Sequence, residues 1–379
     1  MKIYRREGVV AERPHLNLPP STFEEEIGLE GFYGPVSHLY SKNPPTSWKD
    51  IRKSAFQWLK PVEAAEDFLK PQCFKPSVET PAQDFFESRR TLFWNEDVAI
   101  HLHLVAKDTA TYFRNADASD LFFVHEGSGN LESPFGSLAF KKGDYVLVPK
   151  GVSYRFSKTT AYFLRIENFS SLYKKPETGI LGQQALYHEE NIQGPVWKSL
   201  SSPEKSSSVR IQKSGMLTEV SYPHDITHLS GWFGTLYPSV LPVSKIAPIL
   251  SSMAHLPPSV NATFLTDTFI VCTFLPRPLE EPDGALKVPF FHSNIDYDEF
   301  IFYHEGDFFS RDNMSAGSMT LHPRGINHGP HPKAMKGQGK KTRTDEIAVM
   351  VDTVKPLKVS KFARELEVED YWKSWMTNV

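Results

Sequence analysis

One segment occurs twice in this chain, and the repeat constrains the possible folds more than any other feature. The stretch YFRNADASDLFFVHEG aligns with FHSNIDYDEFIFYHEG, so that Asp120 matches Glu299 and Gly127 matches Gly306, each 179 residues apart. Further along, GDYVLVPKGVSY aligns with GSMTLHPRGINH at a spacing of 174 residues, because the second copy has a shorter loop between its halves. Glycine, proline and acidic positions in the same order predict two copies of one β unit.

The residues in and around the repeat favour strands over helices. Apolar runs of strand length, such as VAIHLHLVA and EIAVMVDTV, are separated by Gly, Asn, Asp and Pro. The chain has 29 Pro and 27 Phe, a combination that suits short strands and loops. Helical character is limited to SWKDIRKSAFQWLK near the start and KFARELEVEDYWKSWM at the end, and the polar section Ser199–Gly215 predicts a connector or exposed loop. We therefore expect a mostly β protein.

Charge and cysteine content exclude several classes of protein. Lys and Arg number 42 against 45 Asp and Glu, with no basic stripe for nucleic acid. No apolar run is long enough to span a membrane, and MKIYRREGVV lacks the apolar core of a signal peptide. Only Cys73 and Cys272 occur, which excludes a disulfide framework and predicts that Cys272, in an apolar run, is a buried free thiol. A cytoplasmic location is the expectation.

The repeat resembles the two conserved motifs of the cupin superfamily. His292-x-Asn294-x4-Glu299-x6-Gly306 is similar to the first motif, with Asn294 where many cupins have a second His. Gly317-x5-Pro323-x-Gly325-x2-His328 is similar to the second. The resemblance implies two cupin jelly-roll β-barrel units (a bicupin) with an N-terminal extension and short peripheral helices. We expect residues 1–180 to hold the extension and the first barrel, 181–245 a connector, and 246–379 the second barrel with a C-terminal helix.

The second copy has a complete set of metal ligands at the motif positions. His292, Glu299 and His328 provide two imidazoles and one carboxylate, the facial triad typical of non-haem Fe(II) oxygen chemistry. Turn-forming residues between His292 and Glu299 allow both side chains to point into one barrel. The sequence therefore predicts a metal site in the second barrel, with Fe(II) ahead of other metals.

The first copy lacks this set. Its equivalent positions are Phe113, Asp120 and Tyr154, so we expect the N-terminal barrel to be metal-free and structural. His101 and His103 form an HxH pair, but they lie outside the ligand positions of the repeat. We interpret them as ordinary core or interface histidines, because a metal site also needs a third ligand and supporting residues around it.

Longer stretches resemble the homogentisate 1,2-dioxygenase family. The similar segments are FFHSNIDYDEF, GSMTLHPRGINHGPHP, the lead-in AHLPPSVNATF to FIVCTFLPR, and VSHLYSKNPPTSW near the N-terminus. The resemblance implies an Fe(II)-dependent enzyme that cleaves the ring of homogentisate with O2 to give maleylacetoacetate, a step of tyrosine and phenylalanine breakdown. It also implies a homo-oligomer, either a trimer or a hexamer built from two trimers.

The same resemblance assigns roles to single residues. His292, Glu299 and His328 match the iron ligands, His255 matches a proposed acid/base histidine, and His322 matches a histidine beside the ligands or the substrate. The substrate carboxylate needs a cationic partner, for which Arg311 and Arg324 are the candidates. Phe290, Phe291 and Phe308 stand where other members tend to have tyrosines, which predicts a more apolar substrate pocket with Phe308 in contact with the ring.

Two other functions remain open from the sequence. A bicupin with the same triad can act on a related hydroquinone or phenolic acid such as gentisate, or catalyse a metal-dependent isomerisation. A non-catalytic metal-binding or ligand-binding bicupin is the third possibility. The triad is intact in one copy and lost in the other, which favours catalysis over binding alone.

Overall fold

The computed structural model describes residues 3–65, 67–76, 83–198, 205–311, 313–337 and 341–376 of the chain, and it confirms the predicted mostly β architecture. The α-helices in this part are both short, α1 (Pro332–Gly337) and α2 (Lys361–Glu365). Single turns of 3-10 helix lie at Glu30–Phe32, Gly179–Leu181, Glu189–Asn191, Val243–Lys245, Pro258–Asn261 and Tyr371–Trp375. None of the described helices is long and apolar enough to cross a membrane.

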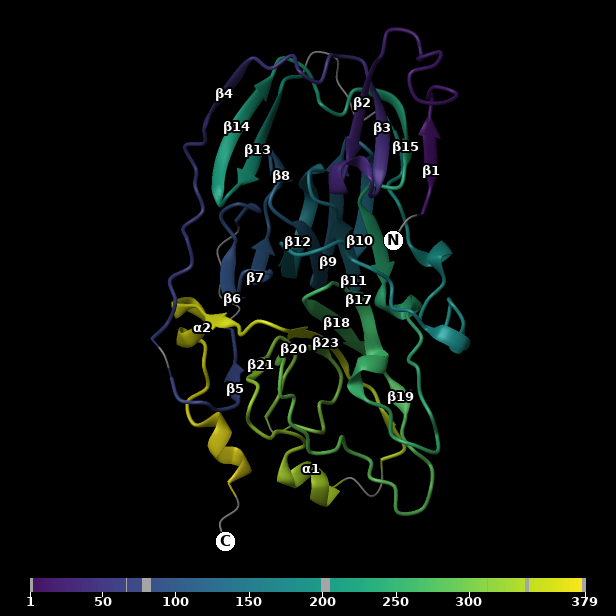
Figure 1. The fold of residues 1–379 in the computed structure, drawn as a ribbon. Helices are drawn as coiled ribbons and strands as arrows, with labels where there is room; N and C mark the ends of the chain where they lie inside the picture. Colours follow the sequence, from purple (N-terminus) through teal and green to yellow (C-terminus); the bar gives the residue numbers. More distant parts are fainter. Residues whose placement is uncertain are drawn as a thin grey trace.

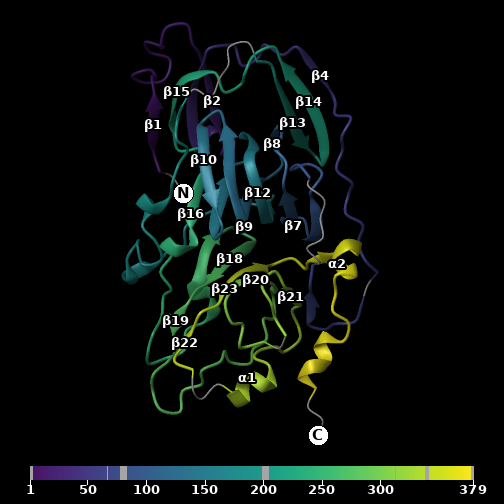
Figure 2. The ribbon, with the colours of Figure 1, turned by 180° about the vertical axis from the view of Figure 1, so that it is seen from behind.

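The strands form two bodies, one above the other in Figure 1 and seen from behind in Figure 2. We call the upper body, with strands from 90–168 at its centre, the N-terminal unit, and the lower body, with strands from 262–353, the C-terminal unit. Strands are exchanged between them: β5 (Gln72–Phe74) joins the C-terminal sheet, and β24 (Lys358–Val359) pairs with a strand of the N-terminal sheet. The two units are therefore linked by backbone hydrogen bonds as well as by packing.

The N-terminal unit is built around a 12-stranded sheet whose longest pair is β9 with β12. Its other long stretches are antiparallel too, and β8 and β13 form a parallel pair. A separate 4-stranded sheet packs at the top of Figure 1. The strands of the large sheet, with β24, are β4 (Asp50–Lys53), β6 (Arg90–Trp94), β7 (Val98–Val105), β8 (Tyr112–Asn115), β9 (Ser119–Ser133), β10 (Gly136–Lys141), β11 (Asp144–Val148), β12 (Ser153–Asn168), β13 (Ser207–Lys213), β14 (Met216–Tyr222) and β16 (Ser239–Pro242). Those of the small sheet are β1 (Arg5–Gly8), β2 (Phe23–Gly28), β3 (Val36–Ser41) and β15 (Leu229–Gly234).

The C-terminal unit has a 6-stranded sheet in the order β17-β18-β23-β20-β21-β5. Within the described residues its pairing does not run full circle, because loops rather than a strand form the wall between 279 and 297. The jelly-roll barrel expected from the motifs is thus present as an open cupin-like unit. Its own strands are β17 (Ala262–Leu265), β18 (Phe269–Phe274), β20 (Asp298–Glu305), β21 (Met319–His322) and β23 (Ile347–Thr353), with a small ribbon of β19 (Arg277–Pro278) and β22 (Arg343–Thr344).

Two local expectations from the sequence were wrong. The segment SWKDIRKSAFQWLK contains the edge strand β4, which pairs with β14, instead of a helix. Residues 207–213, expected as connector or loop, form strand β13 of a hairpin, while 199–204 lie outside the described residues. In both places strand pairing with residues far away in the chain overrides the local preference.

Side chains of the repeated strands alternate between two cores. In β20, Ile301 and Tyr303 face the interior of the C-terminal unit, whereas Phe300 and Phe302 join a large apolar core that also contains Phe123 of β9. This alternation follows from the pleat of a strand, which points successive side chains to opposite faces. One face of each repeated strand therefore builds the contact between the units, and the other lines the interior of its own unit.

The glycine that ends each repeat allows a close strand crossing. Gly127 and Gly306 have φ of 85° and 103°, and a Cβ at Gly306 would lie 2.4 Å from the carbonyl oxygen of Asp345. A side chain at either position would meet the backbone of the neighbouring strand, which explains why the His-Glu-Gly sequence recurs at this point.

Candidate metal centre

The backbone brings His292 and His328 side by side opposite Glu299. Glu299 lies on β20 and points into the C-terminal unit, on the same face as Ile301. His292 lies in the loop before β20, and His328 follows β21. Their backbones form an antiparallel bridge, in which each amide nitrogen donates to the other carbonyl oxygen at 2.9 Å. Residues 36 positions apart in the chain thereby present neighbouring imidazoles.

The three side chains converge on one point. Glu299 Oε2 lies 3.8 Å from His292 Nε2 and 3.7 Å from His328 Nε2. One ligand atom from each residue lies within 4.8 Å of the others, and in the described part of the chain no other His, Cys, Asp or Glu group meets this criterion. The structure thus brings together the three residues predicted from the motifs.

His322 contacts the carboxylate oxygen of Glu299 that is not directed at His292 and His328. It lies directly opposite Glu299 in the β20–β21 pairing, and its Nδ1 is 2.6 Å from Glu299 Oε1. Its ring stacks on that of His328 with centroids 4.7 Å apart. Because Oε1 is engaged by His322, Glu299 Oε2 stays directed at His292 and His328. This is the arrangement by which a supporting residue orients a metal ligand.

The electrostatics keep the carboxylate ionised and His322 neutral. Burial by itself raises the pKa of Glu299, but the histidines around it outweigh this effect and hold the pKa well below its usual range. Burial lowers the pKa of His322 to about 4 against the opposing effect of Glu299. The interaction with Glu299 raises the pKa of His292. The site therefore attracts positive charge, either protons on histidine or a metal cation.

These residues fit a divalent metal ion. The Nε2 atom of His328 is shielded from solvent and has no hydrogen-bond partner among the described residues, although it faces Glu299. Leaving such an atom unpaired in the interior costs free energy that a ligand bond would recover. Two imidazole nitrogens and one carboxylate oxygen are donors that suit iron and related transition metals.

A cavity opens from His292 and Glu299 towards the loops of the C-terminal unit. His255, the predicted acid/base residue, lies at its exposed side, with Nδ1 3.5 Å from Glu280 Oε1. Phe290 stands between His255 and His292, with ring centroids 4.4 Å and 5.4 Å from the two imidazoles. The cavity is also lined by Arg277, Lys287, Ile301, Tyr303, Phe309, Arg311 and Glu346.

The predicted substrate contacts divide into two groups. Arg311 lines the cavity, where its guanidinium donates to the carbonyl of Gly329, next to the ligand His328, at 2.6 Å. Arg324 lies outside the cavity and is bound by Asp298 at 3.1 Å. Phe308 is buried behind Tyr303, and its neighbour Phe309 faces the cavity instead. The structure therefore brings Arg311 to the site and leaves Arg324 and Phe308 away from it.

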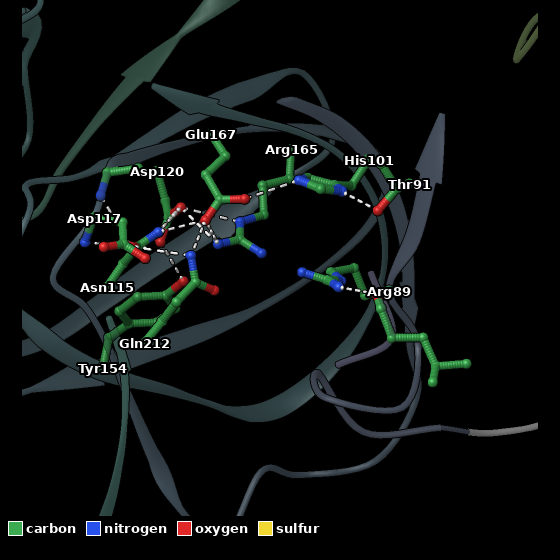
Figure 3. A network of polar contacts seen from close by, with 12 residues as sticks. Arg89, Thr91, His101, Asn115, Asp117, Asp120, Tyr154, Arg165, Glu167 and Gln212 are labelled. Carbon is green, nitrogen blue, oxygen red and sulfur yellow. Dashed lines mark hydrogen bonds and ion pairs between the residues drawn. The ribbon is translucent and has the colours of Figure 1, made fainter. Parts of the chain in front are cut away.

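The first repeat holds a guanidinium among the equivalent residues, as Figure 3 shows. Tyr154 and Phe113 form the backbone pair that corresponds to His328 and His292, and Tyr154 donates to Asp120 at 2.8 Å. Arg165 donates to Asp120 at 2.8 Å and to Glu167 at 3.2 Å. A protein cation thus occupies the interior of the N-terminal unit beside the carboxylate that replaces Glu299.

The HxH pair has ordinary partners. His101 is bonded to Glu167 at 3.0 Å and to Thr91 at 2.9 Å, the latter also visible in Figure 3. His103 is bonded to Ser88 at 3.1 Å and stacks on Phe85. Both are buried, and within the described residues neither belongs to a group of three possible metal ligands.

Sequence reasoning missed four charged residues of the cavity, Arg277, Glu280, Lys287 and Glu346. Arg277 follows strand β18 in the segment TFLPRPLEE, and Glu346 precedes β23. Neither position belongs to a cupin motif. An arginine directly after an apolar strand was the available signal, but a single arginine more often lies at the surface.

Fold and site together define the class of protein: a mostly β cupin protein with a His-Glu-His ligand set in its C-terminal unit. The family model described as homogentisate 1,2-dioxygenase N-terminal matches residues 39–241, and the one described as homogentisate 1,2-dioxygenase C-terminal matches 249–378. The chain belongs to the homogentisate 1,2-dioxygenase family, as its motifs predicted.

The chain is similar to several individual proteins. A protein of Saccharolobus solfataricus that is provisionally named a dioxygenase is 34% identical over 100% of both chains. The homogentisate 1,2-dioxygenase of Dictyostelium discoideum is 25% identical and covers 95% of this chain and 90% of its own. Among solved structures, a cupin 2 conserved barrel domain protein from Leptotrichia buccalis is similar over 73% of this chain and 92% of its own, at 9% identity and a TM-score of 0.35.

Proposed function

We propose that this protein is an Fe(II)-dependent ring-cleaving dioxygenase that converts homogentisate and O2 to maleylacetoacetate. The convergence of His292, Glu299 and His328 on one point, with His292 and Glu299 lining a cavity, in a chain of this family, supports the proposal most. Two imidazoles and a carboxylate suit non-haem Fe(II). Iron bound there supplies the electron transfer that allows O2 to react with an aromatic ring.

The residues around the ligands have separate tasks in this reaction. His322 keeps Glu299 oriented and stays neutral at pH 7. His255 accepts the proton that a ring hydroxyl releases, since its imidazole faces the cavity and Glu280 orients it through Nδ1. Because His255 is partly exposed, it can return the proton to solvent.

The walls of the cavity suit an aromatic ring. Phe274, Ile301 and Phe309 provide apolar surface, and the buried strands β20 and β23 exclude water from the ligand side. When an aromatic ring packs against these walls, its hydroxyl groups face the metal-binding residues and His255. Its acidic side chain then points towards the charged residues further along the cavity. This distribution fits a hydroxylated aromatic acid better than a sugar phosphate.

One assay tests the proposal. The protein is loaded anaerobically with Fe(II), homogentisate and then air are added, and O2 uptake and the ultraviolet absorbance of maleylacetoacetate are followed. We expect uptake with homogentisate, and we expect His255→Ala to keep its iron while turnover falls by about 10²- to 10⁴-fold. Uptake with gentisate but none with homogentisate would overturn the substrate. Failure to bind iron would overturn the class of enzyme.

A further inference from the structure

Arg277 lines the cavity with one guanidinium nitrogen that has no hydrogen-bond partner in the described part of the chain. It lies on the short strand β19, and its Nη1 atom is shielded from solvent with no hydrogen-bond partner among the described residues. Glu346 lies near enough to act electrostatically on both Arg277 and Arg311, yet it forms an ion pair with neither. A shielded guanidinium donor that is left unpaired costs free energy, so the site favours an anion that is not part of the protein.

The other arginines near the site are already engaged. Arg311 donates to the Gly329 carbonyl and, at 3.3 Å, to the hydroxyl of Tyr303, which uses much of its donor capacity. Arg324 is bound by Asp298 and by backbone carbonyls outside the cavity. Of the two cavity arginines, Arg277 is the one with a shielded donor that lacks a partner among the described residues, and its planar fork matches the two oxygens of a carboxylate.

The charged residues that line the cavity indicate the net charge of a ligand that would neutralise them. Cations and carboxylates are equal in number before any metal binds: Arg277, Lys287 and Arg311 against Glu280, Glu299 and Glu346. A divalent metal at the ligand set then leaves two positive charges in excess. A substrate with one carboxylate and one ionised ring hydroxyl neutralises both.

We propose that Arg277 binds the carboxylate of the substrate, so that the enzyme selects hydroxylated aromatic acids over neutral hydroquinones of the same shape. This inference rests on the proposed function for the identity of the aromatic ligand. Arg311 is the second cation of this subsite: it acts electrostatically on Glu346, as Arg277 does, and it donates to the carbonyl of Gly329, next to His328.

The test compares two ligands that differ only in charge. Dissociation constants of 2,5-dihydroxyphenylacetate and its uncharged amide, 2,5-dihydroxyphenylacetamide, are measured without O2 on the Fe(II)-loaded protein. We expect the native protein to prefer the acid by about 10- to 150-fold, the range of a charge-assisted hydrogen bond. Arg277→Met abolishes this preference, Arg277→Lys retains part of it, and the control Arg343→Met, on the exposed side of the same ribbon, leaves it unchanged.

Two results would overturn the inference: equal binding of acid and amide by the native protein, or an undiminished preference in Arg277→Met. Thermal unfolding of the metal-free proteins gives a second test. Removal of an unpaired buried charge leaves Arg277→Met at least as stable as the native protein, and marked destabilisation would show a structural role instead. Because these measurements need no turnover, a lack of O2 uptake with homogentisate would count against the proposed function alone.

Discussion

At the scale of single residues, His322 decides how Glu299 presents its second oxygen to the metal. His322 Nδ1 lies 2.6 Å from Glu299 Oε1, and the imidazole is neutral at pH 7 because burial lowers its pKa to about 4. We predict that His322→Phe keeps the stacking on His328 but loses iron affinity by about 10- to 100-fold. Competition with a chelator measures this affinity. His322→Gln, which retains a donor, should recover part of it, and native affinity in both variants would contradict the role.

Motif spacing was enough to predict which three residues converge at the candidate metal site, but not which charges surround it. His292, Glu299 and His328 are marked by a motif because their spacing follows from strand and turn geometry. Arg277 depends on a loop wall that closes over it from distant parts of the chain, so no local pattern distinguishes it from a surface arginine. For the same reason the sequence could not separate Arg311 from Arg324.

At the scale of elements, the strand pairs β9–β12 and β20–β23 each place two carboxylates opposite one another. The two pairs differ in whether the protein itself supplies a cation between them. Asp120 lies opposite Glu167 in the first pair, and Glu299 lies opposite Asp352 in the second. The first pair supplies its own cation, Arg165 of β12. In the second pair the residue at the equivalent register is Met350, which has no charge, so that in the proposed function a bound metal supplies the positive charge.

We predict that Arg165→Met destabilises the protein by about 3–5 kcal/mol, because it leaves Asp120 and Glu167 as buried carboxylates without a cation. Urea unfolding followed by fluorescence measures the change. The control is Lys174→Met, which removes an ion pair to Asp267 at the surface and should leave the unfolding midpoint unchanged. Equal midpoints for Arg165→Met and the native protein would refute this account of the network.

At the scale of the whole molecule, the two repeats meet with approximate two-fold symmetry. His125 Nδ1 lies 2.9 Å from His304 Nδ1, and these residues occupy the same position in their repeats. His304 packs edge-on against Phe123, and His125 packs edge-on against Phe302. The repeat predicted two related units. It did not predict their face-to-face contact or the exchange of β5 and β24, because these depend on pairing between segments far apart in the chain, which leaves no repeating pattern in the sequence.

This histidine pair makes the contact between the units sensitive to acid. Burial lowers the pKa of both His125 and His304 to about 4, while an unfolded histidine titrates near about 6.5. The unfolded chain therefore binds more protons in this window, and the stability that the neutral pair contributes above about pH 6.5 is lost as the pH falls towards 4. Each histidine accounts for up to about 1.4 kcal/mol per pH unit.

We predict that replacing both with glutamine, His125→Gln with His304→Gln, flattens the fall of unfolding free energy between pH 6.5 and pH 4. Urea unfolding at several pH values measures the slope. Lys142, Glu126 and Glu305 lie around the pair and remain in the variant, as do the other buried histidines, so the difference in slope isolates the pair. The matched control His188→Gln, at an exposed position, should keep the native slope, and a double variant with that same slope would show that the pair does not titrate on unfolding.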